Sequence, residues 1–291
     1  MHLLNRRTLL TTAAAGAGAL AMGRPGLAAP QSFDVFTASP QGAFVDSALI
    51  VGDESALVID AQFAKAEAVR LADMIEATGK RLETIFVTHI HPDHHMGTTV
   101  LKARFPEAKV VAHPVIAELL GQIGQDIFDG RRDLAGYDAS DVWSAPAPLD
   151  GPLTLEGESF EVLEPLQGDT KLITAVAMPQ FDAVVASDIV YNGLDLWLAE
   201  TLTPEDFAGW RAGLDAIAAR TEGIIITGHR THDTTDDRSG IAWTRNMLDG
   251  WEQALDVATD RDSLAAAMAE IMGVDPTGLF AGFAISAAYP E

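Results

Sequence analysis

The sequence predicts a mixed α/β fold in which two β-sheets pack face to face and helices cover the outer face of each sheet. A first β-rich block occupies residues 32–61 and 82–88, and a second occupies residues 152–186. Helical segments follow each block. Each sheet and helix has an apolar face to bury, and stacking them in layers is the usual solution.

The first block begins with strands over residues 43–51 and 56–60, which flank the hairpin turn signal Gly52-Asp53-Glu54. Residues 64–78 predict a helix that ends at Gly79, because apolar residues recur on one face. The elements expected after it are strand 82–88, helix 97–105, strand 109–112 and helix 114–122.

The second block predicts further strands and then helices. The strands are expected at 153–155, 160–166, 171–178, 183–186 and 223–227, and the helices at 203–220, 236–257, 262–272 and 278–288. We interpret the last two helices as packing rather than chemistry. Residues 125–146 lack periodicity, and we interpret them as a loop on the substrate side, because long loops of this kind are often lids or pocket walls.

Residues 1–28 are not expected to be part of the fold. They contain the twin-arginine pattern Asn5-Arg6-Arg7, an Ala/Gly-rich apolar run and Gly26-Leu27-Ala28, which suits cleavage. The sequence therefore predicts an export signal at 1–28, one domain over 29–291, and a periplasmic or secreted protein without stable membrane insertion. An uncleaved N-terminus is the alternative.

Composition excludes several classes of protein. The 291 residues carry a formal net charge of −23 and no Lys/Arg-rich run, which argues against a nucleic-acid partner. Cysteine is absent, so there are no disulfides, thiolate zinc sites or cysteine nucleophile. A small-molecule substrate is the expected partner, and the sequence does not indicate an oligomeric state.

The densest cluster of chemical groups follows strand 82–88. Four of the eight histidines lie within seven residues, and the spacing His-x-His-x-Asp-His places His89, His91, Asp93 and His94 on one turn. A turn lets neighbouring side chains converge, and imidazole with carboxylate suits zinc, iron or manganese. A solvated loop that happens to be rich in histidine is the alternative.

This stretch resembles the metal-binding signature of the metallo-β-lactamase superfamily. The resemblance implies a four-layer αββα sandwich and three later ligands, for which the chain offers Gly168-Asp169-Thr170, Ala186-Ser187-Asp188 and Thr227-Gly228-His229. Order and approximate spacing fit nearly the whole chain after the N-terminal segment. Asp169 stands where the family usually has histidine.

The same resemblance implies two divalent metal ions, with zinc preferred and manganese or iron as alternatives. One ion takes His89, His91 and Asp169, the other takes Asp93, His94 and His229, and Asp188 bridges them. A hydroxide shared by the ions is then the nucleophile, and Asp93 is the catalytic side chain that orients the attacking water. Asp60 is expected either to orient a ligand histidine or to be a strand-end turn residue.

Asp169 leaves three outcomes open. It binds metal directly, binds it through water, or leaves the first site weak or empty. A third carboxylate also shifts preference toward harder ions such as manganese or iron. Two other histidines are expected not to be ligands: His95 beside the cluster, and His113, which we interpret as a structural residue before a helix.

These observations predict an exported metal-dependent hydrolase, acting on an ester, lactone, thioester or amide of a small molecule. One alternative is an iron-dependent redox member of the same fold, and another is a metal-binding relative that has lost catalysis. Residues 189–200, with Tyr191, Trp197 and Leu198, either line the substrate site or pack in the core. The sequence does not identify the substrate.

Overall fold

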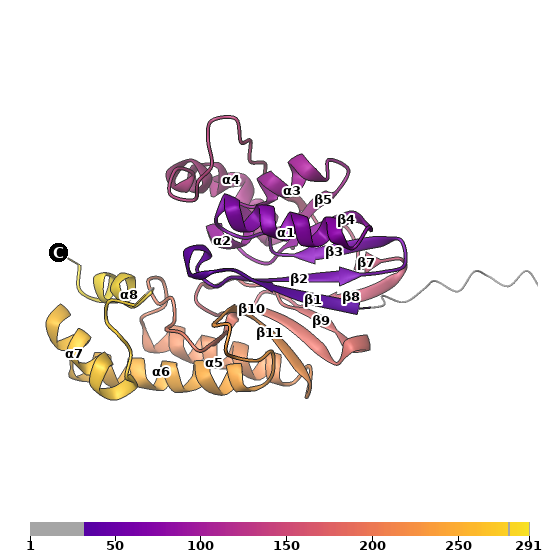
Figure 1. The fold of residues 1–291 in the computed structure, drawn as a ribbon. Helices are drawn as coiled ribbons and strands as arrows, with labels where there is room; N and C mark the ends of the chain where they lie inside the picture. Colours follow the sequence, from indigo (N-terminus) through magenta and orange to yellow (C-terminus); the bar gives the residue numbers. More distant parts are fainter. Residues whose placement is uncertain (1–31, 279, 291) are drawn as a thin grey trace, which may run out of the picture.

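The computed structural model describes residues 32–278 and 280–290 of the chain. The expected export signal at 1–28 lies outside the described residues and stays a prediction. Within the described residues, two sheets lie face to face between two layers of helices (Figure 1). The predicted αββα sandwich is confirmed.

The first sheet has six strands in sequence order. They are β1 (Ser32–Thr37), β2 (Asp46–Val51), β3 (Ser55–Ile59), β4 (Arg81–Val87), β5 (Lys109–Ala112) and β6 (Ala147–Pro148). The strands from β1 to β3 are antiparallel, and those from β3 to β6 are parallel. Parallel neighbours need a crossover, usually a helix. The crossovers here are α1 (Lys65–Ala77), then α2 (Pro92–His95) with α3 (Thr98–Arg104), then α4 (Pro114–Arg131).

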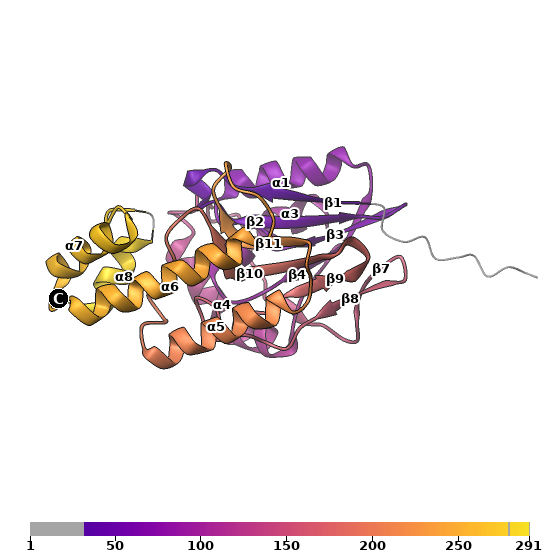
Figure 2. The same ribbon diagram turned by 90° about the horizontal axis from the view of Figure 1, so that it is seen from below.

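The second sheet has the order β11-β10-β9-β8-β7. Its strands are β7 (Leu153–Leu155), β8 (Glu158–Val162), β9 (Val176–Met178), β10 (Ala183–Asn192) and β11 (Ile224–Arg230). The long β10 pairs in parallel with β11 through the crossover helix α5 (Pro204–Ala218). Helix α6 (Ser239–Val257) lies beside α5, while α7 (Arg261–Met272) and α8 (Ala281–Ala288) lie at one end of the sandwich (Figure 2).

Alternation along the strands builds three hydrophobic layers. In β2, Leu49 and Val51 pack toward α1 and its neighbours, whereas Ala48 and Ile50 pack toward the second sheet. This period of two is what a strand buried on both faces requires. A third layer lies between the second sheet and α5 and α6, with Trp210 and Trp251 fully buried in it.

Two expected boundaries are wrong on the first-sheet side of the fold. Helix α4 continues to Arg131, well past the expected end at 122, so the start of the expected loop is helical. Phe128, Tyr137 and Trp143 are buried in the core under this segment. The sequence pattern did not predict this extension because glycines interrupt the helical repeat of apolar residues. Burial of Phe128 nevertheless stabilises the last turns of the helix.

The second sheet also departs from the expected boundaries. The strand expected over 171–178 is regular only at β9, and the strand expected to end at residue 186 continues through Asn192. Register shifts between β10 and β11 flank Ser187, whose φ is +50°. Such bulges turn side chains in new directions without ending a strand. None of the helices in the described residues has the length and apolar character to span a membrane.

Candidate metal centre

The turn after β4 carries four of the seven expected ligands. His89 and His91 precede Pro92, which starts the single turn of α2, and Asp93 and His94 lie within that turn. The turn is held close to the end of β3, because the His94 carbonyl accepts a bond from Ala61 N at 2.9 Å. Gly97 permits this approach, since a Cβ there would lie 1.7 Å from the Ala61 carbonyl oxygen.

The second sheet supplies the other three. Asp169 lies in the segment between β8 and β9, Asp188 in the irregular part of β10, and His229 in β11. Gly228 is required at its position, because a Cβ there would lie 1.8 Å from Asp188 Oδ1. The Gly-His pair in the sequence therefore has a steric reason: the glycine lets the neighbouring strand's carboxylate pass in front of it.

All seven side chains meet in one place. His89, His91, Asp169 and Asp188 form one group of donor atoms, and Asp93, His94 and His229 form another. In the first group, His89 Nε2 lies 3.3 Å from Asp188 Oδ2, and His91 Nδ1 lies 3.3 Å from Asp169 Oδ2. Two ligand atoms bound tetrahedrally to one zinc ion are about 3.3 Å apart, so these spacings fit a metal ion.

Asp188 lies between the two groups. Its Oδ1 is 3.1 Å from His94 Nε2, and its Oδ2 is 3.4 Å from His229 Nε2. His229 Nε2 is also 3.4 Å from Asp93 Oδ2. One carboxylate thus faces donor atoms of both groups, which is the position expected for a bridging ligand.

The hydrogen bonds behind three of the imidazoles fit a metal. His94 Nδ1 donates to Asp60 Oδ2 at 2.8 Å, and His229 Nδ1 donates to the Ala43 carbonyl at 2.7 Å. Thr88 Oγ1 gives its proton to Asp60 and so accepts from His89 Nδ1 at 3.0 Å. Each bond fixes the proton on the outward nitrogen and leaves the Nε2 lone pair directed inward.

In His91 the two ring nitrogens exchange these roles. Its Nε2 donates to Glu200 Oε1 at 3.3 Å, so Nδ1 faces the centre. The buried atoms His89 Nε2, His94 Nε2, Asp169 Oδ1 and Asp188 Oδ1 have no hydrogen-bond partner among the described residues. Unpartnered buried acceptors are costly, and a shared cation would satisfy all of them. The residues present therefore fit a metal centre.

Tyr191 is a neutral partner of two of the expected ligands. Its hydroxyl donates to Asp169 Oδ2 at 2.7 Å, and its ring stacks on His229 with centroids 5.0 Å apart. Tyr191 is fully buried in the core, as one alternative expected, and from there it also contacts two of the expected ligands. Glu200 was missed from the sequence, because its contact with His91 depends on how the segment after β10 folds back.

Burial and neighbouring charges set the pKa values in the metal-free centre. Burial raises the pKa of Asp169 to about 7, although His91 opposes this. Burial lowers the pKa of His89 to about 4. For His94, burial is outweighed by Asp188 and Asp60, and its pKa lies well above the ordinary value. The metal-free centre therefore holds protons that a metal must displace.

The other two singled-out histidines lie outside both donor groups. His95 is fully buried, with its ring 5.3 Å from that of Trp143. His113 precedes α4, and its Nδ1 accepts from Val115 N at 3.4 Å, as a helix-capping residue does. Asp60 is buried against His94 and Thr88, so the structure favours its orienting role over that of a turn residue.

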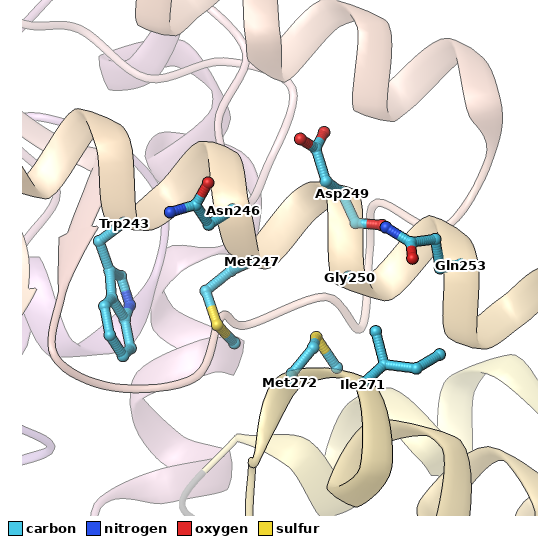
Figure 3. Close-up of a pocket in the computed structure, with 8 residues that line it drawn as sticks. All are labelled: Trp243, Asn246, Met247, Asp249, Gly250, Gln253, Ile271 and Met272. Carbon is cyan, nitrogen blue, oxygen red and sulfur yellow. The ribbon is translucent and has the colours of Figure 1, made fainter.

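A separate cavity of about 430 Å³ lies between α6 and α7 (Figure 3), and none of the seven residues lines it. Trp243, Met247, Ile271 and Met272 line it. Its one acidic group, Asp249, pairs with Arg211 at 2.6 Å. Its lining contains no histidine and only this one carboxylate, so it offers no further group of metal donors.

A family model described as the metallo-beta-lactamase superfamily matches residues 41–229. The chain belongs to this superfamily. The match ends at His229, the last of the seven residues, and so covers the whole candidate centre. No curated protein matches the chain.

Solved structures of superfamily members share the fold. The metallo-β-lactamase DIM-1, in a crystal exposed to ceftazidime, is 18% identical with a TM-score of 0.53, over 75% of this chain and 91% of its own. TMB-1 is 17% identical with a TM-score of 0.52, over 75% and 91%. FIM-1 from Pseudomonas aeruginosa, in its mono-zinc form, is 14% identical with a TM-score of 0.52, over 75% and 89%. At these identities the likeness establishes the fold.

Family membership and the donor groups together support a metal-dependent hydrolase in general terms.

Proposed function

We propose that the protein is an exported hydrolase that holds two divalent metal ions and cleaves an ester, lactone, thioester or amide bond in a small molecule. His89, His91 and Asp169 would hold one ion, Asp93, His94 and His229 the other, and Asp188 both. Zinc is the first choice for this nitrogen and oxygen donor set.

One observation carries the proposal. All four imidazoles donate their outward N–H to a fixed acceptor and point the other nitrogen at the same small volume as three carboxylates. A structural ion-pair network would have no reason to align four lone pairs inward. Catalytic sites need this preorganisation, because ligands that are already oriented need no rearrangement when the metal binds.

Bound divalent ions supply Lewis acidity, which polarises a carbonyl oxygen and lowers the pKa of water. Asp93 contributes an oriented acceptor, since its carboxylate is the most exposed of the three, at 17%, and Oδ2 faces His229. Burial raises the pKa of Asp93, but His94 and His229 outweigh it, so the net shift is downward. Asp93 therefore stays ionised near neutral pH and can accept a hydrogen bond from the attacking water at Oδ2.

The deciding measurement is the metal content of the purified chain by elemental mass spectrometry, beside Asp169→Ala. We expect about two ions per chain in the parent and about one in the variant. Asp133→Ala is the matched control, because this carboxylate is 95% exposed and should leave the content unchanged. A single ion per chain that Asp169→Ala leaves in place would contradict the proposal.

Hydrolysis is tested with the metal-loaded parent on a panel of esters, lactones, thioesters and amides. We expect activity on at least one class, and loss of at least about 100-fold in Asp93→Asn. Absence of activity on every class of substrate in the panel would contradict the hydrolase proposal, even if two metal ions are bound.

The second candidate is an iron-dependent redox enzyme of the same fold. One feature of the donor set supports it: Asp169 adds a third carboxylate, and hard oxygen donors suit iron or manganese. Iron bound to the purified chain, together with oxygen uptake in the presence of a thiol, would support this candidate over hydrolysis.

Export is proposed from the twin-arginine pattern alone. We expect the full-length chain to appear in the periplasm, and Arg6→Lys with Arg7→Lys to retain it in the cytoplasm, as measured by cell fractionation. Equal distribution of parent and double variant would contradict export by this route.

A further inference from the structure

The C-terminal helix α8 reaches the metal centre, although its residues lie beyond the part of the chain that matches the family. Phe280, at the start of α8, is buried, and its ring lies 5.2 Å from the His229 ring and 6.2 Å from the Tyr191 ring. Residues 278–288 were expected to serve packing, and part of this packing is against a ligand imidazole. Figure 1 shows α8 at the end of the sandwich where α2 also lies.

Trp197 lies between the buried Phe280 and the exposed Phe283 and contacts both rings. Its ring lies 5.9 Å from Phe280, 5.0 Å from Phe283 and 6.2 Å from His91. Phe283 is 58% exposed. Trp197, Phe280 and Phe283, which we call the aromatic wall, thus form a continuous path from two ligand imidazoles to solvent.

The aromatic wall is held in place by a specific contact. Asp195 Oδ2 accepts from Phe280 N at 3.2 Å and from Ala281 N at 2.7 Å, which ties the start of α8 to the segment after β10. The Trp197 side chain is only partly buried, so part of its ring remains open to a bound group.

The charges near the metal centre and the aromatic wall disfavour an anionic occupant. The side chains that bond to the seven residues from outside, in the described part of the chain, are Asp60, Thr88, Ser187, Tyr191, Glu200 and Thr201. The two charged ones are carboxylates. Glu200 is 47% exposed and only three residues from Trp197. An anionic group placed on the aromatic wall would be repelled by this carboxylate.

Building on the proposed function, we propose that the aromatic wall binds an aromatic group of the substrate that bears no negative charge, next to the bond that is cleaved. Stacking on Trp197 and Phe283 would orient the substrate, with its carbonyl toward the seven donor residues. These two side chains are then specificity-determining residues of the hydrolase.

Binding is tested without any reaction. Saturation-transfer NMR with 2-phenylethanol, which has no bond to hydrolyse, is recorded on metal-free and metal-loaded protein. We expect saturation of its aromatic protons in both forms, at least threefold less in Phe283→Ala and Trp197→Ala, and weaker saturation of the anionic benzenesulfonate. Leu134→Ala is the matched control, since this side chain is 81% exposed and lies far along the chain from α8.

Hydrolysis gives the second readout. Methyl phenylacetate and methyl acetate share the ester and the leaving group, so their kcat/KM ratio isolates the aromatic group. We expect Phe283→Ala to lower this ratio about fivefold to tenfold, the size of one aromatic contact, with Leu134→Ala unchanged. Because Phe283 is largely exposed, its truncation is expected to leave folding intact.

The two readouts separate failure of the inference from failure of the proposed function. Aromatic saturation that depends on Phe283, in a protein that cleaves neither ester, supports the aromatic wall and counts against ester hydrolysis. Ester hydrolysis with a ratio insensitive to Phe283→Ala, together with saturation that no variant changes, overturns the aromatic wall and leaves the hydrolase standing.

Discussion

The Tyr191 hydroxyl orients Asp169, the carboxylate that stands where the family usually has histidine. Asp169 is shorter than the histidine usual at this place, and its Oδ2 lies between His91 Nδ1 at 3.3 Å and the Tyr191 hydroxyl at 2.7 Å. Because a lone carboxylate can rotate, the hydroxyl is needed to fix which oxygen faces the imidazole. Tyr191 thus acts on the centre through Asp169.

Tyr191→Phe is expected to weaken metal binding about tenfold while leaving stability nearly unchanged, because the ring still stacks on His229. Titration against a chelator measures the affinity. Tyr137→Phe is the matched control, since that buried hydroxyl has no hydrogen-bond partner among the described residues. Equal affinities for the two variants would exclude a role for Tyr191 in holding Asp169.

Gly228 is the second residue whose identity is dictated by close approach. Gly228→Ala would push a methyl group against Asp188 Oδ1, so we expect both a lower melting temperature and loss of bound metal. Gly121→Ala is the comparison, because it lies in α4 with open space around it and should be neutral or slightly stabilising. Calorimetry and elemental analysis of both variants check this; normal metal content in Gly228→Ala would refute the steric argument.

At the scale of elements, the sequence predicted those helices and turns that are stabilised by interactions between residues close together in the chain. The metal-binding turn after β4 could be predicted because four potential ligands fall within six residues. Helix α1 could be predicted because its buried residues repeat at helical spacing. The length of β10 could not be predicted, because its last residues are stabilised by pairing with β11 and by a hydrogen bond to α6. They show no alternation of apolar and polar residues that would mark a strand. Long-range pairing of this kind leaves little trace in a sequence window.

The residues that contact the metal ligands from outside could not be predicted from the sequence either. Glu200 and Phe280 reach His91 and His229 from segments that carry no motif of their own. Their positions depend on where the segment after β10 turns and where α8 docks. No spacing rule connects residue 280 to residue 229, so the sequence could predict α8 only as a packing helix.

The docking of α8 is itself testable through Asp195. Asp195→Ala removes the acceptor for two backbone N–H groups at the start of α8, so we expect faster amide exchange across α8 and a loss of roughly 1 kcal/mol, as for a lost helix cap. Hydrogen exchange followed by mass spectrometry measures it. Asp275→Ala removes an exposed turn bond nearby and should leave exchange in α8 unaltered.

At the scale of the whole molecule, the seven residues join the two halves of the chain. His89, His91, Asp93 and His94 extend from the first sheet, whereas Asp169, Asp188 and His229 belong to the second. A bound metal would therefore fasten one sheet to the other. Because a ligand that binds only the native state stabilises it, the metal should raise the melting temperature.

The size of this stabilisation should depend on pH. In the metal-free chain the Asp169 pKa is raised to about 7 by burial, so its contribution to stability is complete below about 4 and is lost as pH rises through 7. His94, with its raised pKa, acts in the same direction. The metal-free protein thus becomes less stable toward alkaline pH, while a metal has fewer protons to displace there.

We therefore expect the rise in melting temperature on adding metal to be larger at pH 8 than at pH 5.5, by calorimetry of chelated and loaded protein at each pH. Asp169→Asn removes one of the competing proton sites and should flatten the profile, whereas Asp133→Ala should preserve it. A metal effect of the same size at both pH values would mean that these carboxylates and imidazoles hold no exchangeable protons, and hence that the buried charges are balanced in some other way.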